Sequence, residues 1–340
     1  MVKAVVGANW GDEGKGKITD TLADDADVVI RFQGGANAGH TIVNEYGKFA
    51  LHTMPSGVFH PSIMNIIGNG VAFDIEKFMA ELDDVTSKGV PVPQIMVSDR
   101  VQVLMPYHVT FDSLEEARLA GKSFGSTKSG IAPFYSDKYA KIGWQINEFY
   151  QSDEVLREKI ARIAAIKDTM LVHLYDADPI DQEALLTWIK EMRDRVKPYL
   201  GNVSLYLDRA IRENKTILLE GQLGTMKDPD HGIYPMVTSS SPLAAYGAIG
   251  AGIPPYEIKK IVVVSSCPQV RYPDYYGIDM SRMKEFIAFR AAIALVEERG
   301  MQALLEEQYQ KARELESVSH NEHVENVVKA IYAPFSPEEI

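Results

Sequence analysis

A glycine- and lysine-rich segment near the N-terminus has the composition of a phosphate-binding loop. Residues 11–17 read Gly-Asp-Glu-Gly-Lys-Gly-Lys, and they follow an apolar stretch over residues 2–7 that is typical of a β-strand. A helix is expected directly afterwards, over residues 18–23. Because the N–H groups of such a loop and the helix N-terminus converge on one point, we predict an anion site there. A glycine-rich turn with solvated lysines is the alternative.

The same segment raises the question of a metal ligand. The spacing satisfies G-x-x-x-x-G-K, but the next residue is Ile18 instead of the Ser or Thr that ligates Mg²⁺ in an ordinary phosphate loop. Any metal must therefore be held by another group. Asp12 places a carboxylate among amides that would bind phosphate, where it repels the ligand unless it binds a metal or takes a proton. The position of Asp12 therefore indicates a role in metal binding or in proton transfer.

A second glycine-rich segment supplies companions for this loop. Residues 33–41 read Gln-Gly-Gly-Ala-Asn-Ala-Gly-His-Thr and follow a predicted strand that ends at Phe32. Asn37 could bind a base or a phosphate, and His40 could donate a proton. A histidine after a glycine turn is also often structural, so spacing alone leaves both roles open.

The elements that position these loops form an α/β pattern. Short β-branched stretches over residues 2–7, 27–32, 65–67, 216–219 and 260–264 alternate with helical stretches, which predicts a mostly parallel sheet with crossover helices. Apolar residues at helical spacing predict helices that begin after Asp74 and after Ser152, and another over residues 185–196. Their apolar stripes are expected to be core faces.

Composition limits the possible partners. The 340 residues carry a formal net charge of −12, which argues against nucleic acid and against an anionic membrane surface. The sequence has no apolar run of the length that crosses a bilayer, so we expect a cytoplasmic protein. The single cysteine, Cys267, is expected to be a buried thiol and not a ligand or a nucleophile.

The two glycine-rich segments together resemble the adenylosuccinate synthetase family. Residues 9–17 and 33–41 match its two most specific motifs, and the likeness covers residues 1 to about 260. Five further segments match in order: residues 51–57, 66–71, 126–133, 220–224 and 230–240. The resemblance implies a core like that of the P-loop NTPases and, as the reaction, the GTP-dependent joining of IMP to L-aspartate in purine (AMP) biosynthesis. It also implies Mg²⁺ and a homodimer.

The resemblance assigns roles by motif position. Asp12 would take the proton from N1 of IMP and bind Mg²⁺, with the Gly39 carbonyl as a second metal contact, and His40 would stabilise or protonate the oxygen that leaves the γ-phosphorus. The residues implied in GTP binding are Gly11, Asp12, Glu13, Gly14, Lys15, Gly16, Lys17, Gly39, His40 and Thr41. Those implied in IMP binding are Asp12, Lys15, Asn37, Ala38, Gly39, His40, Thr127, Lys141, Gln222, Leu223 and Thr238.

Two of these positions depart from the commonest pattern of the family. Leu223 stands where an IMP-contacting Gln is usual, with Gln222 one place earlier, so either residue could face IMP. Lys141 stands where an Arg usually reaches across the dimer to the IMP phosphate. It keeps the charge and loses the bidentate fork.

After about residue 260 the likeness changes. The family's arginine-rich aspartate-binding loop and its guanine-reading motif do not occur in this sequence. Instead, residues 264–280 and 329–335 resemble the C-terminal part of amidophosphoribosyltransferase, without its catalytic motifs. The expected organisation is a GTP- and IMP-binding core over residues 1–260 and a mainly helical segment over residues 261–340. The alternatives to a ligase are a nonenzymatic nucleotide-binding hybrid or pseudoenzyme, and an amidophosphoribosyltransferase fragment.

Overall fold

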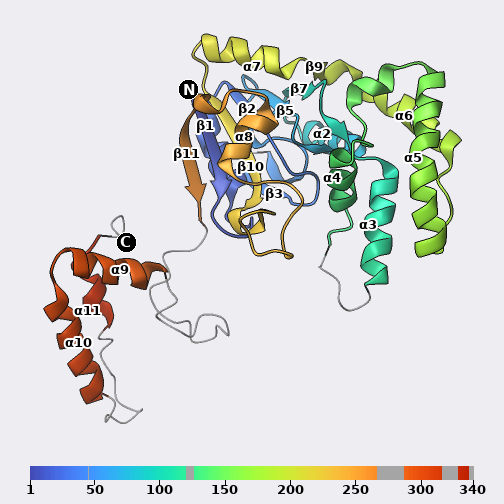
Figure 1. Cartoon of the computed structure of the whole chain (residues 1–340). Helices are drawn as coiled ribbons and strands as arrows, with labels where there is room; N and C mark the ends of the chain where they lie inside the picture. The colour runs from blue at the N-terminus through green and yellow to red at the C-terminus, as the bar shows by residue number, and fades with distance from the viewer. Residues whose placement is uncertain (45, 120–125, 266–286, 316–327, 337–340) are drawn as a thin grey trace. The chain divides into compact units, whose positions relative to one another are not determined.

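The computed structural model describes residues 1–44, 46–119, 126–265, 287–315 and 328–336 (Figure 1). The chain divides into two compact units, Met1–Ser266 and Cys267–Ile340. The expected boundary at residue 260 falls inside a strand of the first unit, and Cys267 lies outside the described residues. Within the described residues, none of the helices is both long enough and apolar enough to cross a membrane.

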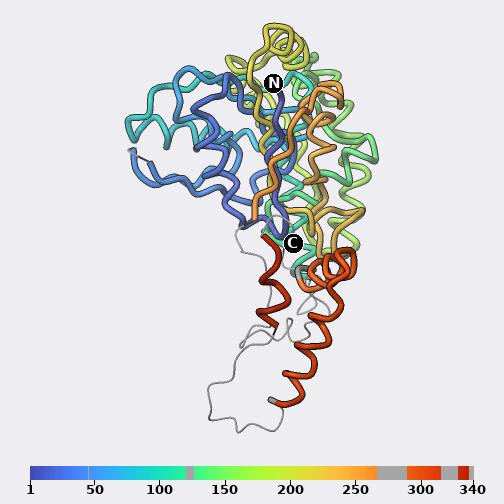
Figure 2. The backbone as a smooth tube through the Cα atoms, turned by 90° about the vertical axis from the view of Figure 1, so that its left-hand side faces the viewer, coloured from blue at the N-terminus to red at the C-terminus, as the bar shows by residue number. Residues whose placement is uncertain are grey.

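A seven-stranded sheet forms the centre of the first unit, in the order β11-β1-β10-β2-β5-β7-β9, and every neighbouring pair is parallel. The prediction of a mostly parallel α/β sheet is thus confirmed. In Figure 2, β1 in blue and β11 in orange run side by side. The strands are β1 (Val2–Gly7), β2 (Val28–Arg31), β5 (Met64–Ile67), β7 (Gln94–Ser98), β9 (Leu200–Gly201), β10 (Ile217–Gly224) and β11 (Ile258–Val264).

Two small sheets accompany the main one. An antiparallel pair joins β3 (His40–Asn44) to β4 (Gly47–Leu51), and a parallel pair joins β6 (Ala72–Phe73) to β8 (Gln102–Val103). The sequence patterns do not predict these strands, nor β7 and β9. One consequence concerns the second glycine-rich segment, whose last two residues, His40 and Thr41, open β3 and do not lie in a loop.

Two of the predicted helices begin directly after the capping residues that the sequence indicates. The Asp74 side chain accepts a hydrogen bond from the Lys77 amide at 3.0 Å, and the Ser152 side chain caps the next predicted helix in the same way. The helices of the first unit are α1 (Lys15–Ala23), α2 (Ile75–Ser87), α3 (Pro106–Arg118), α4 (Ile131–Tyr139), α5 (Asp153–Leu174), α6 (Gln182–Val196), α7 (Val203–Arg212) and α8 (Ala244–Ala251), with 3₁₀ turns η1 (Ser56–Phe59), η2 (Ile146–Tyr150), η3 (Lys197–Tyr199), η4 (Thr225–Lys227) and η5 (Pro255–Glu257). Helix α1 thus begins three residues earlier than predicted.

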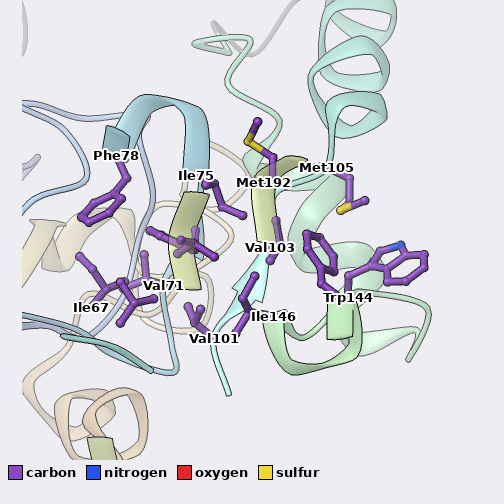
Figure 3. Packing of buried hydrophobic residues seen from close by; sticks show 14 of the residues in the cluster. Ile67, Val71, Ile75, Phe78, Val101, Val103, Met105, Trp144, Ile146 and Met192 are labelled. Atoms are coloured by element: carbon purple, nitrogen blue, oxygen red, sulfur yellow. The ribbon is translucent and has the colours of Figure 1, made fainter. Parts of the chain in front are cut away.

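Alternation along the strands separates the two faces of the sheet. Val6, Ile30 and Leu219 pack with α7 and α8, whereas Val29 and Leu218 pack on the opposite face with the end of α1. The largest apolar cluster lies beyond β5 and gathers side chains from α2, α5, α6 and the segment around Trp144 (Figure 3). The sheet is therefore covered on both faces, as parallel sheets require.

The second unit is helical in the part that the structure describes, as predicted. It contains α9 (Ile287–Glu298), α10 (Gln302–Leu315) and α11 (Val328–Tyr332). Ala292, Val296 and Tyr332 are buried together with Phe335, so these helices have a small core of their own.

The N-cap of α2 offers a test of this local assignment. Replacing Asp74 by alanine removes the acceptor of the Lys77 amide, so the free energy of unfolding should fall by about 1 kcal/mol. Urea denaturation measures this loss. The control, Asp83→Ala on the exposed face of the same helix, should change stability by less than about 0.5 kcal/mol, and equal effects would contradict the capping role.

Candidate functional site

The segment after β1 forms the strand–loop–helix arrangement that was predicted for an anion site. β1 ends at Gly7 and α1 begins at Lys15, with Gly14 as the N-cap in the left-handed conformation at φ 80°. Gly16 lies so close to β3 that a side-chain carbon there would come within 2.6 Å of His40 Cβ. The first turn of α1 and the histidine are therefore neighbours, although they come from separate motifs.

A buried ion pair organises this loop from inside. Glu13 Oε1 accepts hydrogen bonds from the amides of Asn9 at 2.7 Å and Gly11 at 3.0 Å, and Oε2 lies 2.7 Å from Lys15 Nζ. Burial opposes ionisation of Glu13, but the hydrogen bond and charge of Lys15 hold the pKa of the carboxyl below its usual value. Burial lowers the pKa of Lys15, and Glu13 opposes this shift. The carboxylate thus fixes the loop, while Asp12 and Lys17 are exposed.

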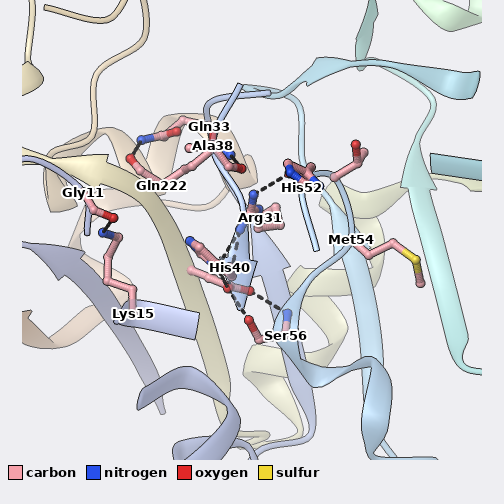
Figure 4. Close-up of polar contacts among 12 residues, drawn as sticks. Gly11, Lys15, Arg31, Gln33, Ala38, His40, His52, Met54, Ser56 and Gln222 are labelled. Carbon is pink, nitrogen blue, oxygen red and sulfur yellow. Dashed lines mark hydrogen bonds and ion pairs between the residues drawn. The ribbon is translucent and has the colours of Figure 1, made fainter. Parts of the chain in front are cut away.

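His40 belongs to a buried network at the carboxyl end of β2 and the middle of β10 (Figure 4). Its Nδ1 lies 2.6 Å from Glu220 Oε1 and 3.0 Å from Arg31 Nη1. Glu220 also accepts hydrogen bonds from the Ser56 amide at 2.8 Å and the Ser56 hydroxyl at 2.5 Å, while Arg31 donates to the His52 carbonyl at 2.8 Å. The network ties four separate segments together.

Electrostatics fixes the proton arrangement of this network. Burial opposes ionisation of Glu220, but its contacts with His40, Arg31 and Ser56 lower its pKa to about 2, so it is a carboxylate that can only accept. We therefore assign the Nδ1 proton to His40, which donates it to Glu220. Burial and the nearby Arg31 charge lower the pKa of His40. Its Nε2 has no hydrogen-bond partner among the described residues.

Gln222 and Leu223 point to different places. The Gln222 side chain is buried, accepts a hydrogen bond from the Gly35 amide at 2.9 Å, and donates to the carbonyls of Gly35 at 2.6 Å and Ala38 at 2.7 Å. It therefore holds the second glycine-rich segment in shape. Leu223 lines a cavity and has a left-handed backbone at φ 64°. Its Cα lies so close to Gly11 that a side-chain carbon there would come within 2.7 Å.

The cavity at Leu223 has a volume of about 530 Å³. Four of the candidate IMP residues line it, namely Asn37, Thr127, Leu223 and Thr238. The structure thus brings together residues that are as far apart in the sequence as Asn37 and Thr238. Lys141 is not among the lining residues; it is exposed on the turn after α4.

The remaining candidates of the second glycine-rich segment flank His40 in the chain. Gly39 and Thr41 are exposed, and Ala38 is partly buried with its carbonyl bound to Gln222. The part of the chain that the structure describes gathers no group of three or more His, Cys, Asp or Glu side chains that could hold a metal ion. Sequence reasoning missed Arg31, Ser56 and Glu220, and it included Glu13 only as a loop member.

Comparisons with known proteins identify the family. The family model for adenylosuccinate synthetase matches residues 4–273, which extends beyond the likeness seen up to about residue 260. The adenylosuccinate synthetases of Dehalococcoides mccartyi and Heliobacterium modesticaldum are each 44% identical, over 261 and 260 residues. These matches cover 76% of this chain and 60% and 61% of the two relatives. The chain therefore spans about 60% of the length of the curated relatives it matches.

Solved structures agree. A fully ligated adenylosuccinate synthetase from Plasmodium falciparum superposes with a TM-score of 0.69 at 31% identity, covering 81% of this chain and 65% of that one. The succinoaminodeoxyadenylate synthetase of cyanophage S-2L, bound to dGMP and dATP, has a TM-score of 0.51 at 21% identity over 77% of this chain, and shows the shared fold alone. With its two glycine-rich motifs converging at one edge of the sheet, the chain belongs to the adenylosuccinate synthetase family.

Proposed function

We propose that this chain is a GTP-dependent carbon–nitrogen ligase that joins IMP to L-aspartate in AMP biosynthesis, with adenylosuccinate, GDP and phosphate as products. The route would pass through a 6-phosphoryl-IMP intermediate. The observation that most supports this function is the close approach of Leu223 to Gly11. Because Leu223 lines the cavity together with Asn37 and Thr238, the cavity lies directly beside the phosphate loop. A nucleotide in the cavity and a triphosphate on the loop would meet there.

The residues of the chain would divide the chemistry between them. Asp12 is exposed next to the loop, where its carboxylate can accept the N1 proton of IMP and so make O6 a better nucleophile. His40 is held through Nδ1 by Glu220, and a second proton on Nε2, favoured once the anionic triphosphate lies beside the ring, would let it stabilise or protonate the oxygen that leaves the γ-phosphorus. Residues 11–17 with Gly39, His40 and Thr41 would bind GTP. The IMP ligands would be Asp12, Lys15, Asn37, Ala38, Gly39, His40, Thr127, Lys141, Gln222, Leu223 and Thr238. Of the two neighbours Gln222 and Leu223, only Leu223 lines the cavity. Gln222 would act indirectly, by holding the second glycine-rich segment in place.

The site also suits Mg²⁺. Magnesium takes one or two carboxylates with phosphate oxygens and water, so the Asp12 carboxylate and the Gly39 carbonyl, both exposed beside the loop, are an adequate protein contribution. When bound, the ion would neutralise charge on the phosphates.

The proposal extends to assembly and organisation. Lys141 is exposed and absent from the cavity wall of its own chain, which supports a homodimer in which it reaches the IMP phosphate of the other subunit. Residues 1–260 would hold the GTP and IMP sites. Residues 261–340 would form a helical segment similar to the C-terminal part of amidophosphoribosyltransferase, and the protein would work in the cytoplasm.

Calorimetry with GTP and ATP tests the nucleotide site. For the 340-residue chain we expect both triphosphates to bind with affinities within about fivefold, because a base-reading motif, absent from this sequence, is what separates them by a few kcal/mol. Adenylosuccinate formation should saturate poorly with aspartate, since each missing charge-assisted hydrogen bond costs about 1.5–3 kcal/mol.

The same titrations separate the alternatives. A strong preference for GTP with ordinary aspartate saturation would show that residues after 260 supply both subsites, and would contradict this expectation. Binding of GTP and IMP without any IMP-dependent release of GDP would favour a nonenzymatic nucleotide-binding protein. Failure to bind either nucleotide would overturn the proposed function.

A further inference from the structure

The cavity beside the phosphate loop has an unbalanced set of charged groups. Three carboxylates line it, those of Asp112, Glu115 and Glu116, and each is already engaged. Asp112 accepts a hydrogen bond from the Ser126 hydroxyl at 2.6 Å, and Glu116 accepts one from the Ser126 amide at 3.2 Å. Glu115 accepts two from Arg118, at 2.7 and 2.8 Å. Each of these carboxylates therefore already has a hydrogen-bond donor within the protein, and Glu115 also has an ion pair.

Among the described residues that line this cavity, Lys227 is the only Lys or Arg. It ends η4, is half-buried, and lines the cavity. Within the described residues its ammonium has no ion pair and no hydrogen bond. Its Nζ lies over the ring of Trp10, 5.5 Å from the ring centroid. An aromatic face holds a cation in place without neutralising it, so the charge stays available to a ligand.

The backbone of Lys227 ties it to another lining residue. Its carbonyl accepts a hydrogen bond from the Thr238 amide at 2.8 Å, which holds the two lining residues next to each other. Both residues line the cavity, and together they carry a hydroxyl and an ammonium that has no ion pair among the described residues. A hydroxyl beside a free cation is the donor set that suits an anion, and lysine binds phosphate as a point charge.

We propose that Lys227 is a specificity-determining residue that binds the 5′-phosphate of the nucleoside monophosphate in this cavity. The inference rests on the proposed function for the identity of that nucleotide. The inference goes beyond the proposed function because it adds a second cation at the phosphate. Lys227 belongs to the same chain as the cavity, whereas Lys141 would come from the other subunit. Lys227 would thus distinguish a nucleotide from its nucleoside.

Calorimetry with IMP and inosine tests the assignment on the full chain. Lys227→Met should weaken IMP binding about 10- to 100-fold, the range expected for one charge-assisted hydrogen bond, and change inosine binding less than twofold. Lys227→Arg should keep most of the IMP affinity because it keeps the charge. IMP affinity should also fall less steeply with salt in Lys227→Met than in the wild type.

Lys259→Met is the matched control. Lys259 also lies over an aromatic ring, with Nζ 5.9 Å from the Tyr256 centroid, but outside the cavity, so its loss should leave both affinities unchanged. If Lys227→Met weakens the binding of IMP and of inosine equally, or weakens neither, the role of Lys227 is wrong while the proposed function stands. A wild-type chain that binds no IMP would overturn it together with the proposed function.

Discussion

Replacing Glu220 by glutamine should lower the free energy of unfolding by about 3–5 kcal/mol, because it leaves the buried Arg31 charge without its carboxylate partner. The same change weakens the hydrogen bonds that the carboxylate accepts from Ser56 and His40. Urea denaturation at pH 7 measures the effect. Glu213→Gln is the control, because that carboxylate is exposed and its ion pair with Lys215 contributes little.

The pH dependence of stability gives an independent check. The pKa of Glu220 is about 2 in the folded protein against an ordinary value of 4.5, so its contribution to stability is fully present above pH 4.5. The contribution is lost as the pH falls from 4.5 towards 2, and it amounts to about 3 kcal/mol. Glu220→Gln should therefore lose less stability than the wild type between pH 5 and pH 3. Parallel pH profiles for the two proteins would show that the carboxylate is not the buried partner of Arg31.

The parts of the fold that follow from local pattern could be predicted from the sequence. The parallel strands and the helices after Asp74 and Ser152 depend on periodicity and capping, which are properties of neighbouring residues. The phosphate loop depends on glycines and lysines within seven positions. These features need no knowledge of distant contacts.

The network around His40 could not be predicted in the same way. Arg31 and Glu220 lie 189 positions apart and meet only because β10 and β2 are neighbours in the sheet, with Arg31 paired in register to Glu220. One signal was present: each is a charged residue within or directly after a predicted apolar strand, and a charge in that position is expensive to bury unless it has a partner. Two such residues of opposite charge could have been paired with each other.

Gln222 shows a second limit of motif comparison. Both it and Leu223 are candidates by position, yet successive residues of a strand face opposite ways. The structure turns the amide towards Gly35 and Ala38, and leaves the apolar side chain on the cavity wall. The motif gives the neighbourhood of the site, but the backbone direction decides which residue can reach a ligand.

Asp12→Asn should have the largest effect on chemistry. We expect the rate of IMP-dependent transfer of the γ-phosphate from GTP to fall by about 10³-fold. The neutral amide of asparagine cannot accept the N1 proton of IMP, and it cannot neutralise the charge of a bound cation. The fold should be unaffected, since Asp12 is exposed and its side chain has no hydrogen bond within the described residues. A single-turnover measurement of GDP release, with protein in excess over GTP, detects transfer even where ligation to aspartate is slow.

The control for this change is Asp25→Asn, an equally exposed carboxylate just after α1, which should leave GDP release unchanged. Binding separates the two parts of the argument. If Asp12 acts in the chemical step, IMP affinity should change little while the rate collapses, because the proton is taken only as the O6–phosphorus bond forms. A variant that keeps more than a tenth of the wild-type rate would remove Asp12 from that role. A variant that loses IMP affinity and keeps its rate at saturating IMP would instead make Asp12 a residue that binds the base, leaving the proton to solvent or to a group that the loop positions nearby.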